Sequence, residues 1–160
     1  MNFTVKVRKI GQDSKIPERA TDGSSGYDVF AYRVLDKESK KVISDLIEPV
    51  EIKPGETALF GIGVCIEIPK THHAIIVSRS GLSTKSRIEA CHPGAPIDSD
   101  YRGEPAVLLK NDGNKSFIVS KHMRIAQMVF IQREIPFIVE TEELSKTERG
   151  DRGHGSTGLY

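Results

Sequence analysis

The stretch 64–69, with the sequence VCIEIP, shows the pattern that decides the fold class. Three branched apolar residues alternate with Cys65 and Glu67, and Pro69 then ends the run. Alternation with a period of two places the apolar side chains on one face of an extended chain, which is typical of a half-buried β-strand. The stretch therefore predicts a strand that ends at the proline.

The same period recurs along most of the chain. Short apolar runs of this kind lie at residues 3–7, 27–32, 74–77, 106–109, 117–119, 125–131 and 137–139. Val50 and Ile52 precede a Pro54-Gly55 pair, a turn signal that favours a hairpin between the flanking strands. Many short strands joined by turns predict an all-β fold, a jelly-roll-like barrel or sandwich.

The stretch 36–47 does not follow this period. Its apolar residues Val42, Ile43, Leu46 and Ile47 come after a charged run. This spacing fits one or two turns of amphipathic helix and equally the tip of a hairpin, so both interpretations stay open. No internal repeat or linker divides the sequence, and 160 residues fit one domain.

The composition excludes several classes of protein. Lys and Arg total 23 and Asp and Glu total 22, so bulk charge does not favour binding to nucleic acid. Cys65 and Cys91 form neither a CxxC pair nor a disulfide framework, which indicates a reducing compartment. No apolar run reaches the roughly 20 residues of a membrane helix. We therefore expect a cytoplasmic protein without a membrane or nucleic-acid partner.

The C-terminal run 149–158, RGDRGHGSTG, contains the pattern GxGxxG. A dinucleotide-binding loop needs a helix after this pattern, and only Leu159 and Tyr160 follow. A P-loop needs a lysine before Ser156, and none is present. Two hypotheses remain: a disordered polar tail, or a mobile tail whose arginines and backbone N–H groups close over a polyphosphate.

Two internal segments carry further candidate residues. Asp98 and Asp100 could orient a water or hold a metal, although the residues alone favour a charged turn before the 106–109 strand. The N–H groups of Ser80 and Gly81, next to Arg79, could cradle a phosphate or belong to a solvated turn. No histidine pair has the spacing of a zinc site on a predictable element.

Taken in order, five segments resemble the motifs of the trimeric dUTPase family. They are 26–31 (GYDVFA), 79–82 (RSGL), 94–104 (GAPIDSDYRGE), 124–127 (RIAQ) and the tail 149–158. The resemblance implies a β jelly roll over residues 1–148 that forms a homotrimer, with a flexible tail, 149–160, that closes a neighbouring subunit's active site. It implies hydrolysis of dUTP to dUMP and pyrophosphate, which limits uracil in DNA and supplies dUMP for dTTP synthesis.

The resemblance also implies roles for individual residues. Asp98 would orient and activate the water that attacks the α-phosphorus. Tyr101 would pack under deoxyribose and exclude a 2′-hydroxyl. Mg²⁺ would be held by the triphosphate and water, with Asp28 nearby through water. The substrate-binding residues would be Arg79, Ser80, Gly81, His92, Pro96, Ile97, Gln127, Arg149, His154, Gly155, Ser156 and Thr157.

The chain departs from the family pattern in its base-binding segments. At position 154 the chain has a histidine, His154, where the family has a phenylalanine that stacks on uracil. At position 92 it has His92 where the family has an asparagine. Two alternatives to a dUTPase remain. One is a dCTP deaminase, or a pyrophosphatase for another or modified deoxypyrimidine triphosphate, on the same fold. The other is a partner-binding regulatory protein, and even a dUTPase could bind a regulatory protein partner.

Overall fold

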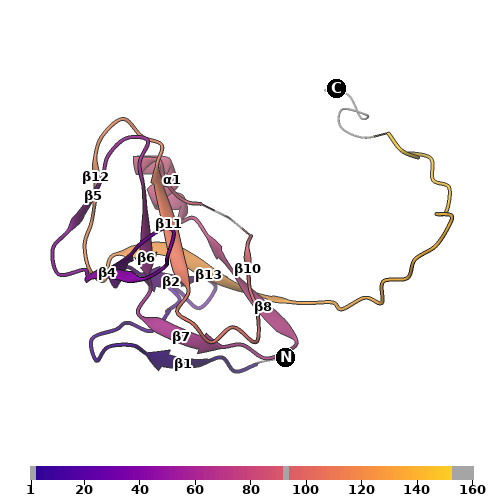
Figure 1. The fold of residues 1–160 in the computed structure, drawn as a ribbon, viewed down its shortest axis with the longest axis horizontal. Coiled ribbons are helices and arrows are strands. Elements are labelled where there is room, and N and C mark those ends of the chain that lie inside the picture. The colour runs from indigo at the N-terminus through magenta and orange to yellow at the C-terminus, as the bar shows by residue number, and fades with distance from the viewer. Residues whose placement is uncertain (1–2, 92–93, 153–160) are drawn as a thin grey trace.

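The computed structural model of the protein describes residues 3–91 and 94–152, and over these ranges the fold is all-β with one short helix (Figure 1). The elements are β1 (Lys6–Lys9), β2 (Tyr27–Phe30), β3 (Arg33–Leu35), β4 (Val42–Asp45), β5 (Val50–Ile52), β6 (Thr57–Gly61), β7 (Val64–Glu67), β8 (His72–Val77), α1 (Ser80–Ser86), β9 (Ile88–Ala90), β10 (Pro96–Ile97), β11 (Ala106–Asn111), β12 (Phe117–Val119) and β13 (Arg124–Gln132). The all-β, jelly-roll-type prediction is confirmed.

Two larger sheets and two small ones make up the body. The larger sheets have the strand orders β4-β3-β6-β11-β9 and β10-β8-β13-β2, and the small ones pair β1 with β7 and β5 with β12. The strands of the described residues pair antiparallel, and most paired strands are distant in sequence. This topology places the 26–31 and 124–127 segments side by side in one sheet, where β8 leads into the 79–82 segment.

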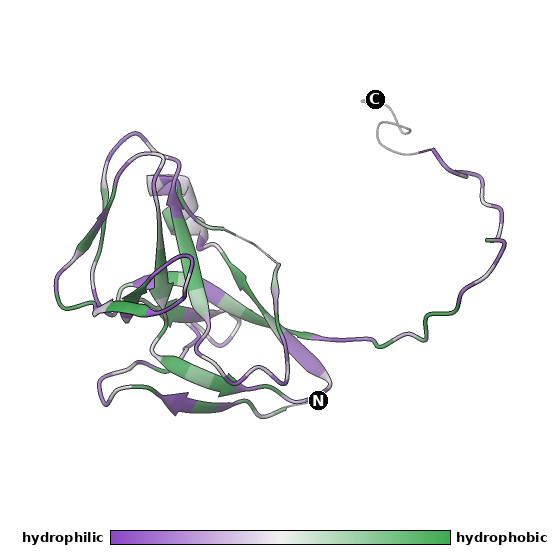
Figure 2. Ribbon diagram, viewed as in Figure 1, coloured by the Kyte–Doolittle hydropathy of each residue, from purple (hydrophilic) through white to green (hydrophobic). Residues whose placement is uncertain are grey.

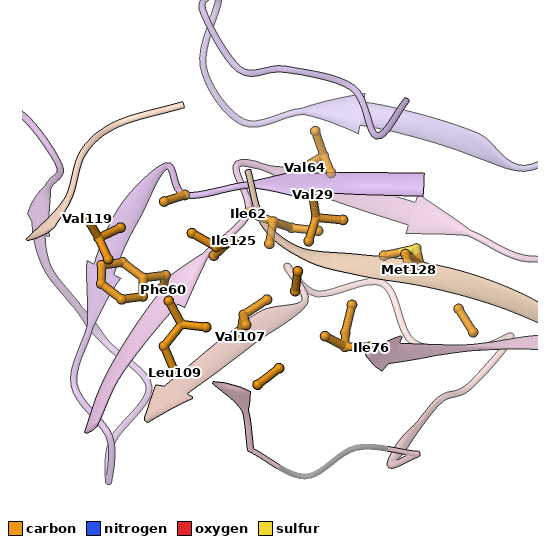
Figure 3. Packing of buried hydrophobic residues seen from close by; sticks show 14 of the residues in the cluster. Val29, Phe60, Ile62, Val64, Ile76, Val107, Leu109, Val119, Ile125 and Met128 are labelled. Atoms are coloured by element: carbon orange, nitrogen blue, oxygen red, sulfur yellow. The ribbon is translucent and has the colours of Figure 1, made fainter. Parts of the chain in front are cut away.

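The core lies between the sheets and follows the alternation of the sequence (Figures 2 and 3). On β11, Val107 and Leu109 are buried, while Ala106 and Leu108 are only partly covered. Phe60 of β6 is fully buried in the same cluster, together with Val29 and Met128 from the second sheet. Each such side chain contributes roughly 1.5–3 kcal/mol relative to its exposed state.

The stretch 36–47 forms a hairpin and no helix. Strand β3 pairs with β4 through the partners Arg33 and Asp45, with a register shift near Leu35. Asp36 caps the turn, because its carboxylate accepts hydrogen bonds from the backbone and side chain of Ser39 at 2.7 Å each. The hairpin interpretation is therefore correct, although Ile43 remains 63% exposed.

The predicted hairpin at Pro54-Gly55 is wrong. The chain does turn there, with a hydrogen bond from the Glu56 N–H to the Lys53 carbonyl at 3.0 Å. Its flanking strands, however, lie in different sheets, β5 beside β12 and β6 between β3 and β11. The backbone of Asn111 bonds to both Gly55 and Glu56, so β11 provides the pairing that a local hairpin would have supplied.

Three other details differ from prediction. The 3–7 strand begins later, at Lys6, and residues 137–139 form no strand, because Phe137 and Ile138 are 98% and 96% exposed and find no neighbouring strand within the described part of this chain. Helix α1 was not predicted; its Ser, Gly and Thr residues are weak helix formers without an apolar period.

After β13 the chain leaves the body and runs outward as an extended segment (Figure 1). Figure 2 shows hydrophobic stretches along this segment. Ile135 and Val139 belong to it and are 72% and 78% exposed. The predicted site residues His92, His154, Gly155, Ser156 and Thr157 lie outside the described residues. No helix of the described chain is long and apolar enough to cross a membrane.

Asn111 generates a test of the fold. Its buried amide donates to the Ile52 and Lys115 carbonyls at 2.8 Å each and accepts from the Gly113 N–H at 2.9 Å. Asn111→Ala should lower the free energy of unfolding by roughly 1–3 kcal/mol, because it leaves the backbone groups of Ile52, Lys115 and Gly113 without their hydrogen-bond partner. Urea denaturation at fixed protein concentration measures this. The exposed Asn114→Ala is the matched control, and equal stability of the two variants would contradict the prediction.

Candidate functional site

A buried carboxylate organises the first half of the site. The Asp28 side chain on β2 is only 1% exposed. Its Oδ1 accepts hydrogen bonds from Arg79 Nε and Gln127 Nε2, each at 3.1 Å, and Arg124 Nη1 lies 3.4 Å from its Oδ2. Charge-assisted bonds of this kind compensate a carboxylate for lost hydration. Asp28 therefore holds three donors in one place.

Strand pairing explains why these groups meet. Strand β13 pairs with β2 so that Gln127 lies opposite Asp28, and it pairs with β8 so that Gln127 also lies opposite Val77. Arg79 follows the end of β8 and is the N-cap of α1. Gly26 leaves room for the amide, since a Cβ at that position would stand 3.0 Å from Gln127 Oε1.

This cluster carries net positive charge at the surface. One carboxylate faces two guanidinium groups, and the side chains of Arg79 and Arg124 are 28% and 49% exposed. Ser80 and Gly81 are exposed and lie at the start of α1, where the first N–H groups of a helix have no intrahelical acceptor. The arrangement suits binding of an anion with several oxygens, such as a phosphate chain.

The second half of the site is a hollow of about 390 Å³. Asp98 and Tyr101 line it with the predicted residues Pro96 and Ile97, and the other lining residues are Lys40, Leu59, Ile76, Cys91, Ala95, Pro105, Ala106, Val107 and Leu108. Asp98 is exposed and begins a turn closed by the Tyr101 N–H at 3.1 Å from its carbonyl. Residues 98–101 therefore form a turn, and the Asp98 side chain borders a hollow lined mostly by apolar residues.

Cys91 forms part of the wall of this hollow. Burial is the main cause that raises the pKa of the thiol, with Asp112 and Glu89 adding to the rise and Lys110 opposing it. A raised pKa keeps the sulfur protonated near neutral pH, and a thiol is a much weaker nucleophile than a thiolate. Cys91 is therefore poorly suited to act as a nucleophile in this hollow.

The two halves stand apart within one chain. Strand β10 pairs with β8 so that Ile97 lies opposite Ala74, and Asp98 therefore lies beside the beginning of β8. Arg79 follows the opposite end of the same strand, after Val77. Roughly six residues of extended chain, about 20 Å, separate the two positions. A single chain thus presents its cationic cluster and its carboxylate hollow at different places.

The structure groups the predicted residues in these two sets. Arg79 and Gln127 meet at Asp28 with Ser80 and Gly81 close along the chain, and Pro96, Ile97 and Tyr101 meet Asp98 at the hollow. Arg149 lies in the extended C-terminal segment. Sequence reasoning missed the parts played by Arg124, Lys40 and Glu104. Arg124 and Glu104 carried a signal, since Arg124 begins the RIAQ segment and Glu104 ends the 94–104 segment, whereas Lys40 carried none.

Comparisons with known proteins match nearly the whole chain. A family model described as dUTPase matches residues 12–158. A deoxyuridine 5'-triphosphate nucleotidohydrolase of Alkaliphilus metalliredigens is 40% identical over 157 residues, 98% of this chain and 99% of that protein. One of Rickettsia bellii is 41% identical over 157 residues, with 98% and 96% covered. The solved dUTPase of Staphylococcus bacteriophage 80alpha with dUpNHpp has a TM-score of 0.81 at 26% identity, with 99% of this chain and 100% of that chain covered.

Proposed function

The chain belongs to the dUTPase family, and from that premise we propose that it hydrolyses dUTP to dUMP and pyrophosphate as a dUTP diphosphatase. The observation that carries the proposal is the pair of sites described above. A cationic cluster around Asp28 suits a triphosphate, and an apolar hollow beside Asp98 suits a nucleoside. Two free cysteines agree with action in the cytoplasm.

Asp98 is the general base in this proposal. Its carboxylate is exposed at the hollow, so it can hold a water beside the bound nucleotide. The water oxygen attacks the α-phosphorus, and Asp98 takes up the proton that the water releases. The bond from the α-phosphorus to the oxygen that bridges to the β-phosphate breaks, and pyrophosphate leaves with the electron pair.

Arg79 and Gln127 grip the phosphate oxygens, with Ser80 and Gly81 donating from the start of α1. Asp28 Oδ1 accepts hydrogen bonds from Arg79 Nε and Gln127 Nε2 at 3.1 Å each, and these bonds fix the orientation of both side chains. Preorganised donors need little reorganisation as charge develops on the phosphates. The described residues contain no group of three or more His, Cys, Asp or Glu that could hold a metal ion. The proposal takes Mg·dUTP as the substrate, because Mg²⁺ prefers phosphate oxygens and retains several waters.

The active sites lie between copies of the chain in a homotrimer. Support comes from the separation of Asp98 and Arg79 along β8, which is too long for one bound α-phosphate to reach both within one chain. The exposed apolar residues Ile135, Phe137 and Ile138 also favour docking of the extended segment on another copy. The segment then delivers Arg149, His154, Gly155, Ser156 and Thr157 to a neighbour's site.

Substrate turnover tests the proposed reaction. With Mg²⁺, the protein should release pyrophosphate from dUTP in preference to dCTP, dTTP and UTP. Asp98→Asn keeps the side-chain shape and removes the base, so the rate on dUTP should fall roughly 10²–10⁴-fold while binding persists. Deamination of dCTP with dUTP left intact would overturn the proposed reaction. Near-normal turnover by Asp98→Asn would show that another group acts as the general base.

Mixing two inactive variants tests the shared site. Asp98→Asn and Arg79→Ala should each be inactive as pure trimers, because every site lacks one essential group. After unfolding and refolding together, some sites should combine an intact Asp98 from one chain with an intact Arg79 from another. Activity should therefore return in part. Absence of recovery in mixed trimers, verified by a mass-tagged chain, would place both residues of a site in the same chain.

Truncation after Glu148 tests the tail. The removed residues 149–160 contain few apolar groups, so the melting temperature should stay nearly unchanged. Turnover should fall roughly 100-fold or more, because the charged and backbone donors that would clamp the distal phosphates are lost. Lys146→Ala, in the same extended segment, is the control. Full activity of the truncated protein would restore the hypothesis of a disordered polar tail.

A further inference from the structure

We propose that Glu104, held by Arg33, is a positioning residue that fixes the Tyr101 ring and thereby sets the preference for deoxyribose over ribose. The inference rests on the proposed function, since it assigns the source of sugar selectivity at the same site. It concerns two residues that lie outside the set expected to touch the nucleotide.

The Glu104 carboxylate is buried and fully engaged. Its side chain is 7% exposed, and Oε2 accepts from Arg33 Nε at 2.7 Å and lies 2.5 Å from Arg33 Nη2. Oε1 accepts from the Gly63 N–H at 2.6 Å. Gly61 makes room for it, because a Cβ there would stand 2.6 Å from Oε1. This forked, charge-assisted contact fixes Glu104 more firmly than a single neutral hydrogen bond would.

The backbone of the same residue holds Tyr101. The Tyr101 hydroxyl donates to the Glu104 carbonyl at 3.0 Å. The ring also covers Gly103, where an added Cβ would lie only 2.4 Å from the hydroxyl oxygen. Tyr101 is 44% exposed, so core packing does not hold its outer side. The carbonyl of Glu104 therefore has a large share in setting the ring position.

Arg33 connects this turn to the five-stranded sheet. It lies on β3, which pairs with β6 through Arg33 and Gly61 and with β4 through Arg33 and Asp45. The hairpin that begins here places Lys40 on the same hollow as Asp98 and Tyr101. The ion pair thus ties the 98–104 turn to a rigid element. Without it, the turn and the ring can shift away from the sugar.

A shifted ring would open space for a 2′-hydroxyl. The expected result is a change in sugar preference, and not only a loss of activity. For Arg33→Ala, kcat/KM for UTP relative to dUTP should rise roughly 10-fold, the lower end expected for losing hydrogen bonds to a charged group. Arg33→Lys keeps the charge but not the planar fork, so its ratio should lie between the parent and Arg33→Ala.

The test measures kcat/KM for dUTP and UTP in the full-length parent, Arg33→Ala, Arg33→Lys, Tyr101→Phe and the double variant Arg33→Ala/Tyr101→Phe. Tyr101→Phe removes only the hydroxyl, so it should raise the ratio in the same direction. If both act through one contact, the double variant should match the larger single effect. Lys110→Ala breaks the exposed pair with Asp112 and is the control, with an unchanged ratio.

Binding of the non-hydrolysable α,β-imido analogues of dUTP and UTP, measured by calorimetry, gives a readout that does not need turnover. If the Arg33 and Tyr101 variants bind the two analogues in a ratio different from that of the parent, the positioning role is supported even when the parent hydrolyses no dUTP. Absence of dUTP hydrolysis by the parent would contradict the proposed function alone. A parent-like ratio in Arg33→Lys, Tyr101→Phe and the double variant overturns the inference, whatever their kcat. Arg33→Lys and Tyr101→Phe keep the test decisive if Arg33→Ala does not fold.

Discussion

Strand β13 pairs with β2 along one edge and with β8 along the other, and the register of the four-stranded sheet depends on this double pairing. A shift by one residue would turn Ala126 and Met128 out of the core and move Gln127 into it. The buried positions therefore hold the strand in one register. That register places Gln127 opposite Asp28 and brings the end of β8, with Arg79, to the same place.

Two buried carboxylates then hold neighbouring side chains and backbone groups in place on the paired strands. Asp28 binds Arg79 and Gln127, and Glu104 binds Arg33 and the Gly63 backbone. Buried ion pairs add little net stability, because desolvation offsets much of the attraction. Their value here is geometric. Each carboxylate fixes the direction of groups that border a solvent-exposed site, and each links a turn or helix start to a sheet.

The pairing of β10 with β8 separates the cationic cluster around Asp28 from the hollow beside Asp98. Asp98 and Arg79 lie near opposite ends of β8, so strand geometry within one chain keeps them apart. The extended segment after Gln132 carries apolar side chains that this chain leaves uncovered. Both facts favour the proposed trimer, in which neighbouring copies would complete each other's sites.

The sequence by itself determined the all-β class and most of the strands, and it supplied the local motifs of the candidate site, because alternation and local motifs depend only on neighbouring residues. Val64 to Ile68 and the 125–131 run reveal their buried faces without knowledge of their partners. Only the tertiary structure decided which strands pair. The backbone of Asn111, distant in sequence, bonds to Gly55 and Glu56, so the chain passes there from one sheet to another and forms no hairpin. Helix α1 has no apolar period from which it could be predicted. Glu104 and Arg33 are 71 residues apart, so no local pattern could show that one holds the other. Such contacts depend on topology, because the free energy that selects them comes from burial and hydrogen bonds between segments far apart in the chain.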